Sequence, residues 1–113
     1  MKLHHAAVLV TDLARAEAFW VGLLGLPVVR RWEARSIWVG LDGDAFLAIE
    51  LAPSVAGSPC LALAIMPAER EPWRARLATA GVAIEKETDY TLYFRDPDGN
   101  LVALSHWPDA ISR

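Results

Sequence analysis

The sequence predicts an α+β fold in which one order of elements, a strand, a helix and three strands, occurs twice. Three observations predict it. Apolar stretches with strand length and with helical spacing follow each other in that order, a glycine follows each helical stretch, and a linker over 52–59 rich in Pro, Ser and Gly separates the copies. The 113 residues, 54% of them hydrophobic, suffice for one domain over 1–113, with halves 3–52 and 60–107 sharing a core.

The first half opens with an apolar strand over 3–10. Asp12 follows it and is typical of a helix N-cap, because its carboxylate can accept a backbone N–H of the first turn. The helix is expected to end at Gly25. Its apolar residues recur at helical spacing: Leu13, Ala16, Trp20, Leu23 and Leu24. Three strands are then expected, over 27–32, 35–41 and 45–51, with Asp42-Gly43 as the tight turn between the last two.

The second half repeats this pattern. A strand over 60–65 precedes a helix within 67–80, which Gly81 ends. Because Pro72 lacks an amide hydrogen, the regular helix is expected to begin only just before it, with Trp73 and Leu77 turned inward. The remaining strands are expected over 82–86, 90–95 and 101–106, and the segment DPDGN (96–100) forms the turn between the last two.

Alternation along the strands separates two faces of each sheet. In 45–51 the odd positions Leu47, Ile49 and Leu51 are large and aliphatic, as expected beneath a helix. The even positions Phe46 and Glu50, and Trp38 in the strand before, then lie on the opposite, open face of the first sheet. In the first strand Val8 and Val10 indicate that the even positions face the helix, so His5 lies on the open face as well. We expect a four-stranded antiparallel sheet in each half, and the two open faces to curl together. The result would be an eight-stranded mixed-sheet cup with the helices outside.

Composition excludes several classes of partner. Fourteen acidic against eleven basic residues, a net charge of −3, argue against nucleic-acid binding. The longest uncharged run, 51–68, contains three prolines and a glycine and is unsuited to a membrane helix. The N-terminus does not fit a signal peptide, and the single cysteine, Cys60, allows no internal disulfide. The sequence therefore predicts a cytoplasmic protein.

Several motifs resemble the vicinal oxygen chelate superfamily, which groups glyoxalases, extradiol dioxygenases, fosfomycin-modifying enzymes and bleomycin resistance proteins. They are HHAAVLVTDL, FWVGLLGL, AIEL and LYFRDPDGNLVAL, and they span 3–107. The resemblance implies paired βαβββ modules and, commonly, a homodimer. In metal-dependent members each module supplies a histidine or equivalent from its first strand and a glutamate from its last.

This chain keeps only part of that ligand set. His5 and Glu50 match the first module's positions, whereas Cys60, or Leu61 if the alignment slips by one, stands at the second histidine position and Ala103 at the second glutamate. His5, Glu50 and Cys60 are the candidate metal ligands, which could form a three-ligand zinc site with an open water position. The competing interpretation makes His5 a hydrogen-bonding pocket residue and Cys60 a small apolar one.

The loss of a carboxylate favours binding over catalysis. We expect no cofactor, with a divalent metal (Zn, Ni, Mn or Fe) as the alternative. Expected ligand-binding residues are Trp32, Trp38, Phe46, Tyr93 and Arg95, of which Tyr93 matches a position that lines the cup in fosfomycin-modifying relatives. The predicted function is bleomycin-resistance-like capture of an aromatic or antibiotic-like small molecule. The alternative is a metal-dependent glyoxalase-like lyase, isomerase or dioxygenase in which Glu50 also transfers a proton.

Overall fold

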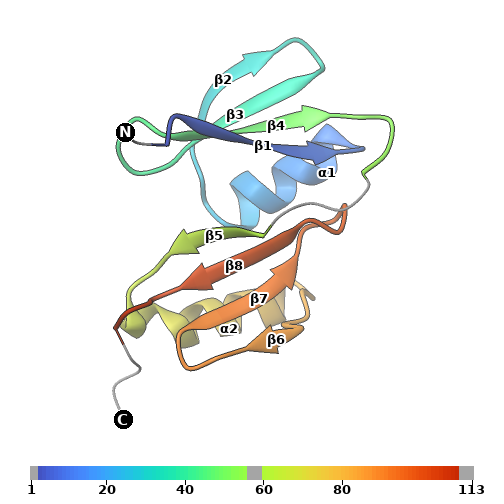
Figure 1. Cartoon of the computed structure of the whole chain (residues 1–113). Helices are drawn as coiled ribbons and strands as arrows, with labels where there is room; N and C mark the ends of the chain where they lie inside the picture. The colour runs from blue at the N-terminus through green and yellow to red at the C-terminus, as the bar shows by residue number, and fades with distance from the viewer. Residues whose placement is uncertain (1–2, 56–59, 110–113) are drawn as a thin grey trace. The chain divides into compact units, whose positions relative to one another are not determined.

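The computed structural model describes residues 3–55 and 60–109 and divides the chain into two compact units. Unit 1 extends from the N-terminus to Ser58 and includes Pro97–Gly99; unit 2 holds the rest. Each unit consists of a four-stranded sheet with helical segments on one face (Figure 1). The predicted α+β class and the repeated strand–helix–three-strand order are confirmed.

The first sheet has the strand order β1-β4-β3-β2. Its strands are β1 (His5–Val10), β2 (Val28–Trp32), β3 (Ser36–Gly40) and β4 (Phe46–Leu51). β1 runs parallel to β4, while β3 is antiparallel to both β4 and β2. The sheet is therefore mixed, and the expectation of purely antiparallel pairing within a half was wrong. The helix between β1 and β2 returns the chain to the starting end of β1, so a strand on the far side can pair with β1 in the same direction.

The second sheet repeats this topology with the order β5-β8-β7-β6. Its strands are β5 (Leu61–Ala64), β6 (Lys86–Glu87), β7 (Thr91–Arg95) and β8 (Leu101–Ser105), and β5 is parallel to β8. The strand expected over 82–86 is replaced by the two-residue β6, which begins where that segment was expected to end. Between β7 and β8, Asp96 accepts hydrogen bonds from the backbone and side-chain nitrogens of Asn100, which fixes the DPDGN turn.

The first helix begins after Asp12 and ends before Gly25 as predicted, but its second part is not an α-helix. The Asp12 carboxylate accepts the backbone N–H of Arg15 at 3.0 Å and caps α1 (Leu13–Glu17). The chain then continues as a π-helix, η1 (Ala18–Leu23), and Gly25 follows with a positive φ of 76°. In η1 the N–H of Leu24 bonds to the carbonyl of Phe19, five residues back. This wider spacing buries Phe19 and Trp20 together.

The second helical segment has two parts. A 3-10 turn, η2 (Pro67–Glu69), leads into α2 (Arg70–Thr79), so Pro72 lies in the first turn of the regular helix, as expected. Leu77 is fully buried, whereas Trp73 is only half-buried, so the core role expected for Trp73 is only partly met. Among residues 3–55 and 60–109, no helix has the length and apolarity needed to cross a membrane.

The core of unit 1 lies between the helical segments and one face of the sheet. The strand residues that the alternation predicted to be buried are buried: Val8, Val10, Ile37, Val39, Leu47 and Ile49. Ala48, on the other face of β4, is buried as well. Leu51, also expected in the core, is 45% exposed because it ends β4. The other face of the sheet is left without a helix in its unit.

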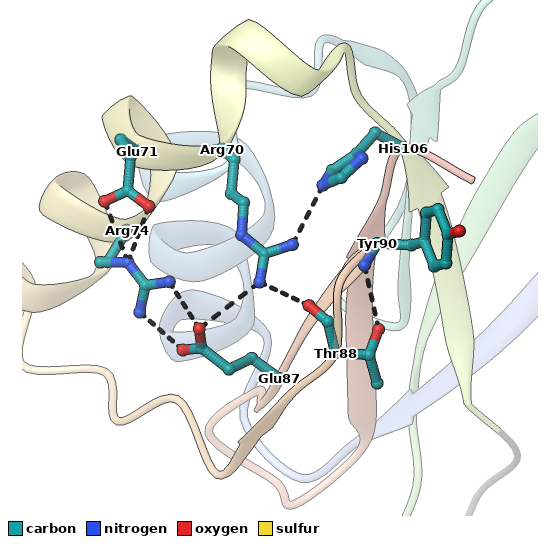
Figure 2. A network of polar contacts seen from close by, with 7 residues as sticks. All are labelled: Arg70, Glu71, Arg74, Glu87, Thr88, Tyr90 and His106. Carbon is teal, nitrogen blue, oxygen red and sulfur yellow. Dashed lines mark hydrogen bonds and ion pairs between the residues drawn. The ribbon is translucent and has the colours of Figure 1, made fainter. Parts of the chain in front are cut away.

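The N-terminal part of α2 is held to its sheet by polar contacts, of which that between Arg70 and His106 is buried (Figure 2). The Arg70 side chain is 4% exposed and donates to the Thr88 carbonyl at 2.6 Å and to Nε2 of His106 at 3.0 Å. Arg74 makes two hydrogen bonds to Glu87, at 2.7 and 2.8 Å, and a further ion pair with Glu71. Arg70 therefore joins α2 to the segments before β7 and after β8.

Candidate functional site

The open face of the first sheet carries the side chains that alternation assigned to it. In register, His5 lies opposite Phe46, Trp38 opposite Ala48, and Trp32 opposite Ser36. Because directly paired residues on neighbouring strands point to the same side, these side chains share one face. Ser36 and Leu9 both lie opposite Glu50, which places the carboxylate on this face too.

Four rings on this face form a continuous series, which we call the aromatic row: His5, Phe46, Trp38 and Trp32. The rings of His5 and Phe46 are stacked with centroids 4.9 Å apart, and those of Phe46 and Trp38 with centroids 4.4 Å apart. Trp32 follows at 5.4 Å from Trp38, tilted by 60°. The row crosses all four strands and gives this face a long aromatic surface.

The aromatic row ends on a cation. The guanidinium carbon of Arg30 lies 3.9 Å from the centroid of the Trp32 ring, a cation–π contact. Arg30 pairs in register with Trp38, after an irregularity in β2 between Val28 and Arg30. Arg30 is not among the residues predicted from the sequence to bind a ligand. Arg30 and Trp32 are two residues apart in one expected strand, so the alternation could have placed both on the same face.

A hollow of about 350 Å³ lies beside the Trp32 end of the row. Its lining combines an aromatic ring, charged groups and a hydroxyl: Trp32, Glu33, Arg35, Ser36, Glu50 and Leu51. The Ser36 hydroxyl oxygen is buried and has no hydrogen-bond partner in the described part of the chain. Glu50 is exposed and makes no ion pair with any residue the structure describes.

The structure does not bring His5 and Glu50 together. Along β1 and β4 the register places Glu50 four residues beyond the partner of His5. At about 3.3 Å per residue, the two positions are about 13 Å apart along the strands. Two side chains that bind the same ion cannot bridge that distance. The Nδ1 atom of His5 lies instead 2.7 Å from Nδ1 of His4, and the His5 ring stacks on Phe46. In this unit His5 is a member of an aromatic cluster.

The second sheet carries the other predicted residues on its open face. Tyr93 pairs with Ala103, and Ala103 with Ala62, so these three share one side. Cys60 precedes Leu61 and has the parity of Ala62, which favours Cys60 over Leu61 as the residue on this face. Arg95 lies near Cys60 and forms an ion pair with Glu85 at 3.1 Å.

The Cys60 environment does not favour a thiolate. Partial burial raises the pKa of the Cys60 thiol above its ordinary value, and the positive charge of Arg95 opposes this rise less strongly. Zinc and related ions bind cysteine as the thiolate, so an ion at Cys60 would have to displace the proton of its thiol. Ala103, where the resemblance places a glutamate, is buried between Tyr93 and Ala62.

The donor set therefore does not fit a divalent metal. Across residues 3–55 and 60–109 no three His, Cys, Asp or Glu side chains are grouped so that they could hold an ion. The separation of His5 from Glu50 and the alanine at 103 are the physical reasons. We derive no chemical step through a metal.

Comparisons with known proteins agree with the architecture. A family model described as the Glyoxalase/Bleomycin resistance protein/Dioxygenase superfamily matches residues 2–104. Glutathione transferase FosA of Serratia marcescens is 32% identical over 111 residues, covering 90% of this chain and 78% of that protein. The two chains are therefore similar over nearly the whole sequence described here.

Solved structures are similar in fold at lower sequence identity. Lactoylglutathione lyase from Agrobacterium tumefaciens has a TM-score of 0.83 at 21% identity, covering 96% of this chain and 97% of that one. The fosfomycin resistance protein FosX from Listeria monocytogenes, crystallised with Mn(II) and sulfate, has a TM-score of 0.80 at 19% identity, covering 93% and 89%. At these identities the likeness establishes the fold.

Proposed function

Because the chain belongs to the glyoxalase/bleomycin resistance protein/dioxygenase superfamily, we propose that it binds a small molecule with a flat aromatic part on the open face of its first sheet. The observation that carries the proposal is the aromatic row across that face. The protein holds this ligand without converting it. Binding by capture needs shape and contact area only, and the row supplies both.

Stacking explains why a flat ring is the favoured ligand. Trp38 and Phe46 are half-buried and Trp32 is 40% exposed, so much of the row remains accessible. Aromatic rings attract each other in offset or edge-to-face arrangements beyond the free energy of simple burial. A planar ligand can cover several of these rings at once. Tyr93 and Arg95, on the second sheet, remain predicted ligand contacts and are part of the same proposal.

An enzymatic function is the second candidate, supported by the 32% identity to a glutathione transferase. In that case Glu50, which has no ion-pair partner among the described residues, would be the proton-transferring base. Capture is preferred because the predicted metal ligands are separated or replaced. Turnover of a bound compound, lost in Glu50→Gln, would favour the enzyme.

The proposal is tested by titrating the protein with a neutral flat probe, 2-(2-naphthyl)ethanol, followed by ¹H–¹⁵N NMR. We expect amide shifts concentrated on β3 and β4, and an affinity that falls roughly three- to tenfold in Trp38→Ala. Trp107→Ala is the matched control, because Trp107 is 70% exposed and lies outside the aromatic row. Unchanged affinity in Trp38→Ala, or failure of the folded protein to bind any flat probe, would overturn the proposal.

Pairing of two chains is part of the proposal because the family resemblance implies it. Light scattering at working concentration is expected to give the mass of a homodimer. A monomer mass throughout would contradict this part alone, since the aromatic row lies within one unit of one chain.

A further inference from the structure

The hollow beside the aromatic row has unmet acceptors. Glu50 and Ser36 lie directly opposite each other on β4 and β3, and Trp32 lies opposite Ser36 on β2. Directly paired side chains begin about 5 Å apart, so the carboxylate, the hydroxyl and the ring meet at one place. The Glu50 carboxylate makes no hydrogen bond or ion pair with any described residue, and the buried Ser36 hydroxyl has no hydrogen-bond partner among them.

The residues that line the hollow are negative in sum. Its lining holds two carboxylates, Glu33 and Glu50, against one guanidinium, Arg35, which leaves one net negative charge. Arg35 makes no ion pair with either carboxylate in the described structure. The other nearby cation, Arg30, lies against the Trp32 ring. A carboxylate and a hydroxyl oxygen offer acceptors, so the complementary group is a cation with several N–H donors.

We infer that this hollow binds the protonated amine of a ligand whose flat aromatic part lies on the aromatic row. The inference rests on the proposed function and names its ligand class, an aromatic compound bearing an alkylammonium group. The ammonium donates to Glu50 and lies beside Trp32, a ring that already accepts one cation. The Ser36 oxygen, which is buried, becomes a second acceptor when its side chain turns toward the hollow. The volume of about 350 Å³ is ample for an aminoalkyl group.

The test compares three probes that share one ring system: 2-(2-naphthyl)ethylamine, 2-(2-naphthyl)ethanol and 2-naphthylacetate. At low salt we expect the amine to bind roughly fivefold more tightly than the alcohol, the upper range for a partly exposed ion pair. The acetate is expected to bind most weakly. Added salt is expected to reduce the preference for the amine and to leave the alcohol unaffected.

Substitutions test which residue causes the preference for the amine. Glu50→Gln keeps the shape and removes the charge, so it is expected to lower the amine's affinity to that of the alcohol and leave the alcohol's unchanged. Asp42→Asn, an exposed carboxylate in the turn before β4, is the matched control and is expected to preserve the preference. Ser36→Ala is expected to weaken amine binding by a smaller factor.

The outcomes separate this inference from the function on which it rests. An alcohol that binds on the row together with an amine that binds no more tightly would overturn the inference and leave the proposed function standing. Tighter binding of the acetate would also overturn the inference and would point to Arg35. No binding of any probe would overturn both.

Discussion

The guanidinium of Arg70 and the imidazole of His106 lie 3.0 Å apart inside unit 2, both almost completely buried. Arginine has donors only, so Nε2 of His106 must accept this hydrogen bond. Nδ1 then carries the proton and donates it to the carbonyl of Asp109. The contact therefore fixes the tautomer of a buried histidine.

The tautomer can be observed directly. We expect the ¹⁵N spectrum of His106 to show a proton on Nδ1 and an accepting Nε2, because a proton on Nε2 would point at the Arg70 guanidinium. His5, whose Nδ1 faces another histidine, provides a contrasting resonance. A proton on Nε2 of His106 would contradict the hydrogen bond.

Removing the guanidinium should weaken the fold. Arg70→Met keeps an apolar stem but leaves the Thr88 carbonyl and Nε2 of His106 without a donor, so the free energy of unfolding should fall by about 2–4 kcal/mol. Arg74→Met is the matched control. The Arg74 side chain, which bonds to Glu87, is 34% exposed. Losing this contact should therefore lower the free energy of unfolding by about 1 kcal/mol or less. Urea denaturation measures both, and equal losses would refute the distinction.

Asp98 makes an analogous contact in unit 1. Its carboxylate accepts hydrogen bonds from the backbone N–H and hydroxyl of Thr11 and pairs with Arg15 at 3.1 Å. Asp98→Ala leaves the Thr11 groups without this acceptor, and we expect a loss of about 1–3 kcal/mol of stability in urea denaturation. Asp42→Asn, in an exposed turn, should change stability by less than about 0.5 kcal/mol. If Asp98→Ala left the free energy of unfolding unchanged, water would replace the carboxylate without loss of stability.

Replacing either of two tryptophans by alanine should change the stability of the protein by very different amounts. Trp20 is fully buried, so Trp20→Ala should lower the free energy of unfolding by about 3–5 kcal/mol. Trp107 is 70% exposed, and Trp107→Ala should cost less than about 1 kcal/mol, mainly through its edge contact with Tyr90. Thermal unfolding followed by circular dichroism compares them. Similar melting temperatures would place Trp20 outside the core.

The reactivity of Cys60 follows from its environment. Because partial burial raises the pKa of the thiol, its thiolate fraction at pH 8 is smaller than that of a free cysteine, and alkylation by iodoacetamide should be slower. Arg95→Gln removes the charge that opposes this rise, so the pKa should increase further and alkylation at pH 8 should slow again. Faster alkylation of Arg95→Gln would show that Arg95 shields the sulfur.

Alternation in the sequence was sufficient to place most of the first sheet's side chains. It predicted which face of each strand meets the helix because one face must be apolar, and Ile37, Val39, Leu47 and Ile49 confirm it. It could not predict the π-helical turn at Phe19, because that depends on how the helix packs on the sheet. Nor could it find the unpaired Ser36 hydroxyl, since hydrogen-bond satisfaction depends on the positions of neighbouring strands.

The resemblance correctly gave the family but not the geometry of the candidate ligands. His5 and Glu50 have the expected parity, and the open face holds both. The distance between them depends on the register in which β1 pairs with β4. Motifs that match each strand separately do not determine this register. The register of β3 with its neighbours brings Glu50 to Ser36 and Trp32.

The parallel pairing of β1 with β4 has a consequence for synthesis of the protein. Val10 pairs with Leu51, and in the described sheet β1 has β4 as its sole neighbour. On the ribosome, the first strand therefore emerges long before the segment that completes its backbone hydrogen bonds. Until residue 51 leaves the exit tunnel, the nascent polypeptide carries an apolar, unpaired strand, which is a ready substrate for a chaperone.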